Sequence, residues 1–314
     1  MQADVLDRTV ENELDQRVGE LSSQVGNTPL FPITRVFNKP NVKLFAKLEW
    51  QQMGSSVKAR PAYRIIREAV AAGQLNEGKS LLDATSGNTG IAYATFGAAL
   101  GIPVTLCVPE NISSERKRLL LALGAKLIYT SAFDNTDGAQ IEAKRLFAEN
   151  PHKYYYADQY ANAENWKAHF FGTSNEVINQ TNAEVTHFVA GLGTSGTFTG
   201  TGRGLKNLNP DIHLTSLQPD GILHGLEGWK HMESAIVPKF YDSTLADQNL
   251  EIDTQEALNL IPEVARKEGL LISPSSAANL LGAMKVAEQV DEGVIVTVFP
   301  DNADKYKEII DELF

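Results

Sequence analysis

The sequence holds a single cysteine and no long apolar run. Cys107 cannot form a disulfide within the 314-residue chain, and its apolar surroundings, IPVTLCVP, predict a buried core thiol rather than a reactive one. No apolar run approaches the ~18 residues that a membrane span needs. The first residues, MQADVLDRTVENELDQRVGEL, lack the basic and apolar regions of a signal peptide. We therefore expect a soluble, cytoplasmic protein.

Positive charge is also scarce. With 28 basic and 39 acidic residues the formal net charge is −11, which argues against nucleic acid or an anionic membrane as the main partner. The six histidines show no HExxH or CxxC partner spacing, so we expect no catalytic metal. Small molecules, anionic ones included, remain as partners.

Short apolar runs rich in β-branched residues alternate with segments of helical period, as in Pro61–Ala72. This order predicts an α/β protein with mostly parallel sheets that helices cover on both faces, and the length favours two domains. Asp220–Ser243 has no clean period and is interpreted as a functional loop. The expected strands are 42–50, 79–85, 103–109, 126–130, 186–193, 213–219 and 294–301.

Two polar turns follow expected strands. DATSGNTG, Asp83–Gly90, brings Thr85, Ser86, Asn88 and Thr89 to a helix start, where hydroxyl, amide and main-chain N–H groups suit a carboxylate or a phenolate oxygen. The alternative is simple helix capping by Ser86 or Asn88.

The second turn, GLGTSGTFTGTGRG, spans Gly191–Gly204. Its glycines let the backbone approach an anion closely and its hydroxyls add donors, which is typical of a phosphate site. Gly191-x-Gly193-x-x-Gly196 with Asp220 downstream also fits a dinucleotide fingerprint, so a nicotinamide-dependent oxidoreductase is an alternative.

Lys58 lies in GSSVKARPA, after small residues and an apolar strand and just before an expected helix. A partly desolvated crevice lowers the pKa of an ammonium group and gives the neutral amine that forms a Schiff base. A carbonyl cofactor with a phosphate group would use this lysine and both turns, and pyridoxal phosphate (PLP) is such a cofactor.

A fourth segment, LLISPSSAANLLGA, places Ser275 and Ser276 at a helix start. A hydroxyl facing a pyridine nitrogen leaves the ring largely unprotonated, which suits elimination at Cβ. The alternative is that the two serines only cap the helix.

Together these segments resemble the cysteine synthase family of fold type II PLP enzymes. The motifs are VGNTPL, KLEWQQMGSSVKARPA, DATSGNTGIA, ISSERKRLLLALGA, THFVAGLGTSGTFTGTGR and ISPSSAA, and they cover nearly the whole chain. The resemblance implies two three-layer α/β/α domains like those of the tryptophan synthase β-subunit. Residues 1–29 and 51–160 would form a smaller mobile domain, and residues 30–50 and 161–314 a larger domain that binds the PLP phosphate.

The resemblance also implies the site residues. Lys58 would bind the cofactor aldehyde and remove the Cα proton, Asn88 would contact the 3′ oxygen, and Ser275 would face the pyridine nitrogen. The phosphate would lie against Gly193, Thr194, Ser195, Gly196 and Thr197. The substrate carboxylate would lie against Thr85, Ser86, Thr89 and Gln159.

The implied reaction is β-replacement: an activated serine loses its leaving group to give an α-aminoacrylate, and sulfide adds to give L-cysteine. O-acetylserine is the favoured donor. O-phosphoserine is the alternative, because Lys230 in the 220–243 segment could pair with its phosphate.

Some positions depart from the family pattern, among them Ser195 in place of a glycine and SPSSAA in place of a glycine-rich turn. Cystathionine formation, serine or threonine elimination and a PLP-binding regulatory homologue therefore stay open as alternatives. A homodimer is implied by the family alone.

Overall fold

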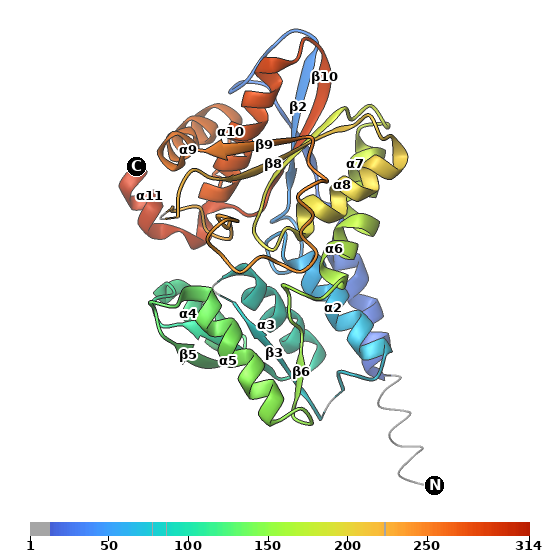
Figure 1. The fold of residues 1–314 in the computed structure, drawn as a ribbon, viewed down its shortest axis with the longest axis vertical. Coiled ribbons are helices and arrows are strands. Elements are labelled where there is room, and N and C mark those ends of the chain that lie inside the picture. The colour runs from blue at the N-terminus through green and yellow to red at the C-terminus, as the bar shows by residue number, and fades with distance from the viewer. Residues whose placement is uncertain (1–12, 77, 86, 223) are drawn as a thin grey trace. The chain divides into compact units, whose positions relative to one another are not determined.

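A computed structural model describes residues 13–76, 78–85, 87–222 and 224–314 (Figure 1). The chain divides into two compact units. The first contains Lys58–Asn165 and the chain up to Val25, and the second contains Gly26–Val57 and Trp166–Phe314. The family implies a smaller mobile domain of residues 1–29 and 51–160 and a larger domain of residues 30–50 and 161–314. That these two parts move separately stays a prediction.

The first unit is built on a parallel sheet with the strand order β5-β4-β3-β6. Residues 13–20 are helical and precede a short 3-10 turn, η1 (Leu21–Gln24). The strands are β3 (Ser80–Ala84), β4 (Val104–Pro109), β5 (Lys126–Thr130) and β6 (Tyr154–Tyr156). The helices are α2 (Ala59–Ala71), α3 (Asn88–Leu100), α4 (Ser114–Ala122) and α5 (Asn135–Glu149), while α6 (Glu164–Ala168) contains the boundary between the units.

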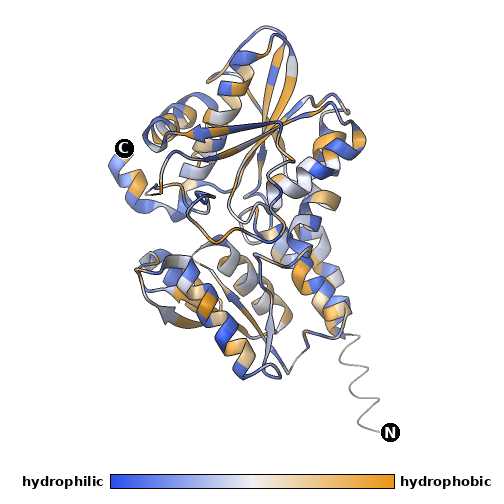
Figure 2. Cartoon of the chain, in the orientation of Figure 1, coloured by the Kyte–Doolittle hydropathy of each residue, from blue (hydrophilic) through white to orange (hydrophobic). Residues whose placement is uncertain are grey.

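Helices cover both faces of this sheet. An added Cβ on Gly97 of α3 would lie 2.4 Å from Val104, so α3 packs closely on one face of β4. On the other face Cys107 of β4 packs with Ala139 and Ala143 of α5, a helix that shows both apolar and polar colouring in Figure 2. Cys107 is fully buried, which confirms the predicted core thiol, and burial raises its pKa to about 12.

The second unit contains a six-stranded sheet with the order β1-β2-β10-β7-β8-β9. All neighbouring strands are parallel except β1 and β2. The strands are β1 (Leu30–Ile33), β2 (Val42–Leu48), β7 (His187–Gly191), β8 (His213–Pro219), β9 (Gln248–Ile252) and β10 (Gly293–Phe299). The other elements are a π-helix η2 (His169–Thr173), α7 (Ser174–Gln180), α8 (Gly196–Leu208), α9 (Thr254–Glu268), α10 (Pro274–Gln289), η3 (Ala303–Lys305) and α11 (Lys307–Leu313).

Alternate residues of these strands point to opposite faces. Val189 of β7 packs in one cluster with residues of α9 and α10, whereas its neighbour Phe188 packs with Phe198 of α8 and Val177 of α7. The second unit is therefore also three-layered. The predicted α/β class with mostly parallel sheets is confirmed.

Three strands were not predicted from the sequence, and all three are edge strands: β1, β6 and β9. An edge strand is exposed along one side and needs no continuous apolar run, and β1 even contains a proline, Pro32. Helix α2 begins at Ala59 and not near Pro61 as predicted, so Lys58 occupies its N-cap position.

One charged side chain lies deep in the second unit. The Lys47 ammonium group is fully buried and donates to Glu176 (2.7 Å), to Gln180 (3.0 Å) and to the carbonyl oxygen of Thr28 (2.8 Å). These bonds join β2 to α7 and to the VGNTPL segment, which stabilises the charge in the core. Among the described helices, none is both long and apolar enough to cross a membrane.

Candidate functional site

Several hydrogen bonds hold the loop before Lys58. The Gln52 side-chain amide donates to the Glu49 carbonyl (2.9 Å) and carboxylate (3.0 Å) and to the Ser56 carbonyl (3.2 Å). Gly54 and Ser55 both have positive φ, +85° and +49°, which explains the glycine at the sharpest part of the loop. The main-chain N–H of Val57 donates to Pro300, at the end of β10 (2.8 Å). Lys58 is therefore the next residue after a fixed segment.

Lys58 itself is half-buried, and its carbonyl oxygen accepts the first hydrogen bond of α2, from the N–H of Ala62 (3.1 Å). The helical period expected for Pro61–Ala72 forms an apolar stripe in which Ile65, Ile66 and Ala69 are buried and Val70 is half-buried. The stripe fixes which way the helix faces. The orientation of α2 in turn fixes the direction in which the Lys58 side chain leaves the backbone.

The turn after β3 is organised by Thr85. Its buried hydroxyl oxygen accepts hydrogen bonds from the N–H groups of Gly87 and Gly90, both 3.2 Å, and this leaves its own proton for another acceptor. The N-cap of α3 is Gly87, with no side-chain cap, and Asn88 is the first helical residue. The alternative in which Asn88 caps the helix is therefore wrong. Ser86 lies outside the described residues.

Thr89 and Gln159 bind each other. The Thr89 hydroxyl donates to Gln159 Oε1 (2.8 Å), and Gln159 Nε2 donates to the carbonyl oxygen of Ala84 (2.7 Å). The carbonyl of Ala84 can only accept, so the orientation of the Gln159 amide is defined and its second N–H remains available. The structure thus brings together three of the four residues expected to hold a carboxylate: Thr85, Thr89 and Gln159.

The glycine turn between β7 and α8 has the features of an anion site. Ser195 has φ +63°, a left-handed conformation, and precedes the first turn of the 13-residue helix α8, whose N–H groups point out of its amino end. Thr194 Oγ1 accepts a hydrogen bond from the Gly196 N–H (3.4 Å). Thr197 Oγ1 lies 3.3 Å from His169 Nε2, on the π-helix.

A second segment packs on this turn. An added Cβ on Gly191 would lie 2.1 Å from the Trp229 ring, and one on Gly193 would lie 2.0 Å from the carbonyl oxygen of Gly228. The N–H of Lys230 donates to the carbonyl of Leu192 (2.8 Å). Residues 228–230 belong to the irregular segment 220–243, so these glycines are needed for close packing between two loops as well as for an open turn.

Among the three serines at the start of α10, only Ser275 has a hydroxyl proton without a fixed acceptor. Ser276 donates to the carbonyl of Asp301 (2.7 Å), and Ser273 donates to Ser276 (3.0 Å) and accepts the Ser276 N–H (3.2 Å). Each hydroxyl has one proton, and those of Ser273 and Ser276 are already donated. The Ser275 proton can therefore go either to Ser273 (3.2 Å) or to another acceptor. The cap is therefore Ser273. The alternative of Ser275 and Ser276 as a capping pair is wrong.

Each unit by itself carries groups that fit one part of a cofactor with a phosphate and a ring nitrogen. The second unit supplies a helix amino end with three hydroxyls for the phosphate, on Thr194, Ser195 and Thr197, and the Ser275 hydroxyl for a ring nitrogen. The first unit supplies the amine of Lys58 and the Thr85 turn. No group of three or more His, Cys, Asp or Glu side chains among the described residues could hold a metal ion.

Three supporting residues were not predicted. Asp83 is fully buried beside the Thr85 turn, and His169 contacts Thr197. Asn279 of α10 accepts the Gly191 N–H (2.8 Å) and donates to the Val298 carbonyl (2.8 Å), so it fixes the end of β7. The available signal was polarity in an apolar setting: an aspartate at the end of a strand, and an asparagine inside an apolar helix.

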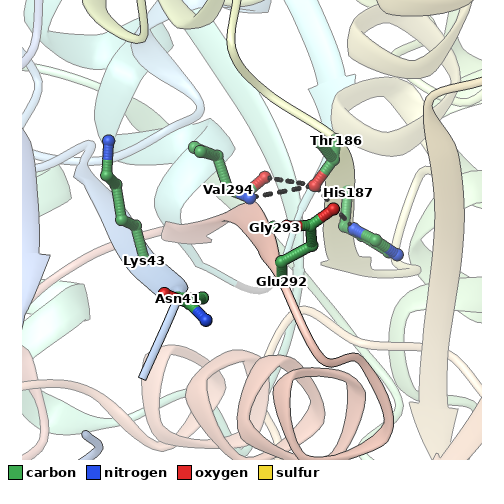
Figure 3. A pocket seen from close by; sticks show the side chains of 7 residues that line it. All are labelled: Asn41, Lys43, Thr186, His187, Glu292, Gly293 and Val294. Carbon is green, nitrogen blue, oxygen red and sulfur yellow. Dashed lines mark hydrogen bonds between the residues drawn. The ribbon is translucent and has the colours of Figure 1, made fainter. Parts of the chain in front are cut away.

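A surface pocket of about 440 Å³ lies elsewhere, where β2, β7 and β10 begin (Figure 3). The Thr186 hydroxyl bonds the main chain of Val294 there and lies 2.8 Å from His187 Nδ1. The Gly191–Thr197 turn follows the opposite end of β7, so this pocket is separate from the predicted site. Its lining residues are Asn41, Lys43, Thr186, His187, Glu292, Gly293 and Val294.

Comparison with known proteins defines the class. Residues 21–301 match the family of pyridoxal-phosphate dependent enzymes, and the chain belongs to that family. It is 46% identical to a cysteine synthase of Aquifex aeolicus over 289 residues, which are 90% of this chain and 88% of the relative. An O-acetylserine dependent cystathionine beta-synthase of Bacillus subtilis is 35% identical, with 92% and 96% covered.

A solved structure supports the same assignment. The crystal structure of cysteine synthase from Entamoeba histolytica superposes with a TM-score of 0.85 at 31% identity and covers 93% of this chain and 94% of that one. Within the PLP-dependent enzymes, the chain belongs to the cysteine synthase family. The cofactor of the family is pyridoxal phosphate, so the nicotinamide-dependent alternative is wrong.

Proposed function

We propose that this protein is a cysteine synthase that replaces the acetate of O-acetylserine with sulfide to give L-cysteine. The observation that carries the proposal is the 46% identity to a cysteine synthase along nine-tenths of the chain, in a protein whose predicted turns have the geometry described above. When bound, pyridoxal phosphate supplies an aldehyde for the substrate amine and an electron sink for loss of the Cα proton and of the β-substituent.

The residues of the first unit would bind and orient the amino acid. Lys58 would hold the cofactor in the resting enzyme and then accept the Cα proton on its amine. Thr85 would donate its remaining proton to the substrate carboxylate, and Gln159 its second N–H. Thr89 would act mainly through the orientation of Gln159, because its own hydroxyl proton is used there. Ser86 completes the set predicted for the carboxylate, and Asn88 would contact the 3′ oxygen of the cofactor.

The residues of the second unit would hold the cofactor. The N–H groups and hydroxyls of the 193–197 turn would bind the phosphate, with Gly193 and Gly196 allowing close approach. Ser275 would donate to the ring nitrogen rather than transfer a full proton, because a hydroxyl is a far weaker acid than a carboxylic acid. This choice suits elimination at Cβ over reactions that need a longer-lived carbanion.

The test is the visible absorbance of the purified protein after pyridoxal phosphate is added. We expect a band above the wavelength of free cofactor, its loss in Lys58→Ala, and L-cysteine formation from O-acetylserine and sulfide. Lys126→Ala, at an exposed lysine of β5, is the matched control and should keep both properties. A wild-type protein that stays colourless with added cofactor would refute the proposal.

A second candidate acceptor follows from the Bacillus subtilis relative, whose name gives cystathionine synthesis from O-acetylserine. Sulfide and homocysteine assayed side by side with O-acetylserine distinguish the two reactions, and release of pyruvate without an acceptor would indicate elimination instead. We propose sulfide as the preferred acceptor.

Lys230 bears on which activated serine is the donor, O-acetylserine or O-phosphoserine. Its main chain is held to Leu192 beside the glycine turn, and its Nζ lies 3.3 Å from the carbonyl of Ile236. The positive charge of Lys230 next to this turn would favour a donor that carries a phosphate, so O-phosphoserine is the alternative donor. Lys230→Ala should then reduce kcat/KM for O-phosphoserine and leave that for O-acetylserine within about twofold.

We propose further that the enzyme acts as a cytoplasmic homodimer with a smaller mobile domain and a larger phosphate-binding domain. The acidic composition supports small-molecule substrates over nucleic acid or anionic membranes. Light scattering of the holoenzyme measures the mass, and a monomer at micromolar concentration would contradict the dimer.

A further inference from the structure

Asp83 connects two segments of the first unit. Its carboxylate is fully buried at the end of β3, where Oδ1 accepts the N–H of Ala84 (2.8 Å) and Oδ2 accepts the N–H of Gln159 (3.2 Å). Gln159 follows Asp158, which has a left-handed backbone with φ +46°. The Asp83 carboxylate therefore fixes the main chain at Gln159, directly after Asp158 with its unfavourable backbone conformation.

The Gln159 side chain completes a closed arrangement. Gln159 Nε2 returns to the carbonyl of Ala84, whose own N–H is bound by Asp83. Gln159 Oε1 then accepts the hydroxyl proton of Thr89. The position of the Gln159 amide and the direction of the Thr89 hydroxyl thus both depend on the main-chain bond that Asp83 accepts.

We propose that Asp83 is a positioning residue for substrate binding, which holds Gln159 and through it Thr89 in the geometry that receives the substrate carboxylate. This inference rests on the proposed function, since it takes the Thr85–Thr89 turn as the carboxylate site. Asp83 acts through Gln159 and does not itself touch the substrate.

The surroundings of Asp83 make this role dependent on pH. Burial, with a smaller contribution from the charge of Asp158, raises the pKa of the Asp83 carboxyl group to about 7. A protonated carboxyl group accepts hydrogen bonds more weakly than a carboxylate, so the bond from Gln159 should weaken below this pH. Burial and, to a smaller extent, the charge of Asp83 raise the pKa values of the other titratable groups around it, which are Tyr93 of α3, Cys107 of β4, Tyr155 and Tyr156 of β6, and Tyr160.

The test compares Asp83→Asn and Asp83→Glu with the wild type, all as holoenzymes. Asparagine keeps the volume but cannot accept both N–H bonds, so we expect KM for O-acetylserine to rise about tenfold while kcat changes less than about threefold. Wild-type KM should rise as the pH falls through about 7, and that of Asp83→Asn should not. Glutamate keeps the charge and should recover part of the affinity.

Two readouts do not depend on turnover. Titration with L-alanine, followed by the cofactor absorbance, measures binding of an amino acid that has no leaving group. Amide hydrogen exchange of the apoprotein should show lost protection at Gln159 in Asp83→Asn. Cys107→Ala, a buried change in the neighbouring strand, controls for general loosening and should leave KM unchanged.

A wild-type KM and pH profile in Asp83→Asn would overturn the proposal. So would a fall in kcat and cofactor content at constant KM, or the same rise in KM in Cys107→Ala. If the wild type binds L-alanine but turns over no O-acetylserine, the proposed reaction fails, while the L-alanine affinities still test Asp83.

Discussion

The N–H of Lys230 donates a 2.8 Å hydrogen bond to the carbonyl oxygen of Leu192, at the start of the glycine turn after β7. The two residues are far apart in sequence, and the bond places the irregular segment directly on the predicted phosphate site. Trp229 and Gly228 fill the space that side chains on Gly191 and Gly193 would need. The glycine turn and the 228–230 segment should therefore respond together to mutation.

Gly193→Ala should separate these two segments. The new Cβ would lie 2.0 Å from the main-chain oxygen of Gly228, which cannot rotate away, so the segment must move. We expect a loss of about 1–3 kcal/mol in the free energy of unfolding and at least a tenfold weaker affinity for pyridoxal phosphate. Urea unfolding and cofactor titration measure the two effects. Gly221→Ala is the control, because nothing lies within 4 Å of its added Cβ.

Ser195→Gly should have opposite effects on stability and on cofactor affinity. The left-handed backbone of Ser195, φ +63°, favours glycine, so the apoprotein should gain about 0.5–1 kcal/mol in urea unfolding. Loss of the hydroxyl should weaken cofactor binding several-fold. Ser195→Ala removes the hydroxyl and keeps the Cβ, and should weaken binding without the gain. Equal stability of the glycine and alanine variants would contradict the conformational argument.

The two serines of α10 should differ in the property they control. Ser275→Ala removes the proton that can reach a ring nitrogen, so the pH dependence of the cofactor absorbance should change while stability stays within about 0.5 kcal/mol. Ser276→Ala removes the donor to the buried Asp301 carbonyl and should cost about 1–3 kcal/mol with little spectral change. Identical behaviour of the two variants would show that the proton assignment is wrong.

His187 should reduce the stability of the protein in acid. Burial, and then the neighbouring His213, lower the pKa of His187 in the folded protein, so below about pH 6.5 the unfolded chain binds more protons. The free energy of unfolding should therefore fall as the pH drops from about 6.5 to the pKa of the folded state, and this fall should be smaller in His187→Gln. His152→Gln, at an exposed position, should behave as the wild type in urea unfolding between about pH 7.5 and 5.

Much of the architecture could be predicted because its signals are local. Each buried parallel strand, such as β4 or β10, is a nearly continuous apolar run, and the turns after β3 and β7 carry residue types that suit an anion. The edge strand β9, with the sequence QNLEI, lacks such a run because only its pairing with β8 makes it a strand. Local patterns do not contain that information.

The chemistry of the site was predictable by residue type, but its hydrogen bonds were not. Thr89 and Gln159 lie 70 residues apart, and nothing in either segment indicates that they bind each other. Likewise the N-cap of α10 is Ser273 and not Ser275 or Ser276, because only Ser273 has the extended backbone that an N-cap requires. Such choices depend on three-dimensional geometry.

The buried ammonium of Lys47 joins β2 to α7 and to the VGNTPL segment. It has exchanged water for a carboxylate and an amide oxygen of α7 and for a main-chain carbonyl of the VGNTPL segment, so β2 and α7 cannot separate without leaving a charge unpaired in an apolar interior. Opening one of these segments alone would leave the ammonium buried without its carboxylate, whereas unfolding the segments together returns the charge to water. The VGNTPL segment, β2 and α7 should rank among the last parts of the second unit to exchange their amide hydrogens with deuterium.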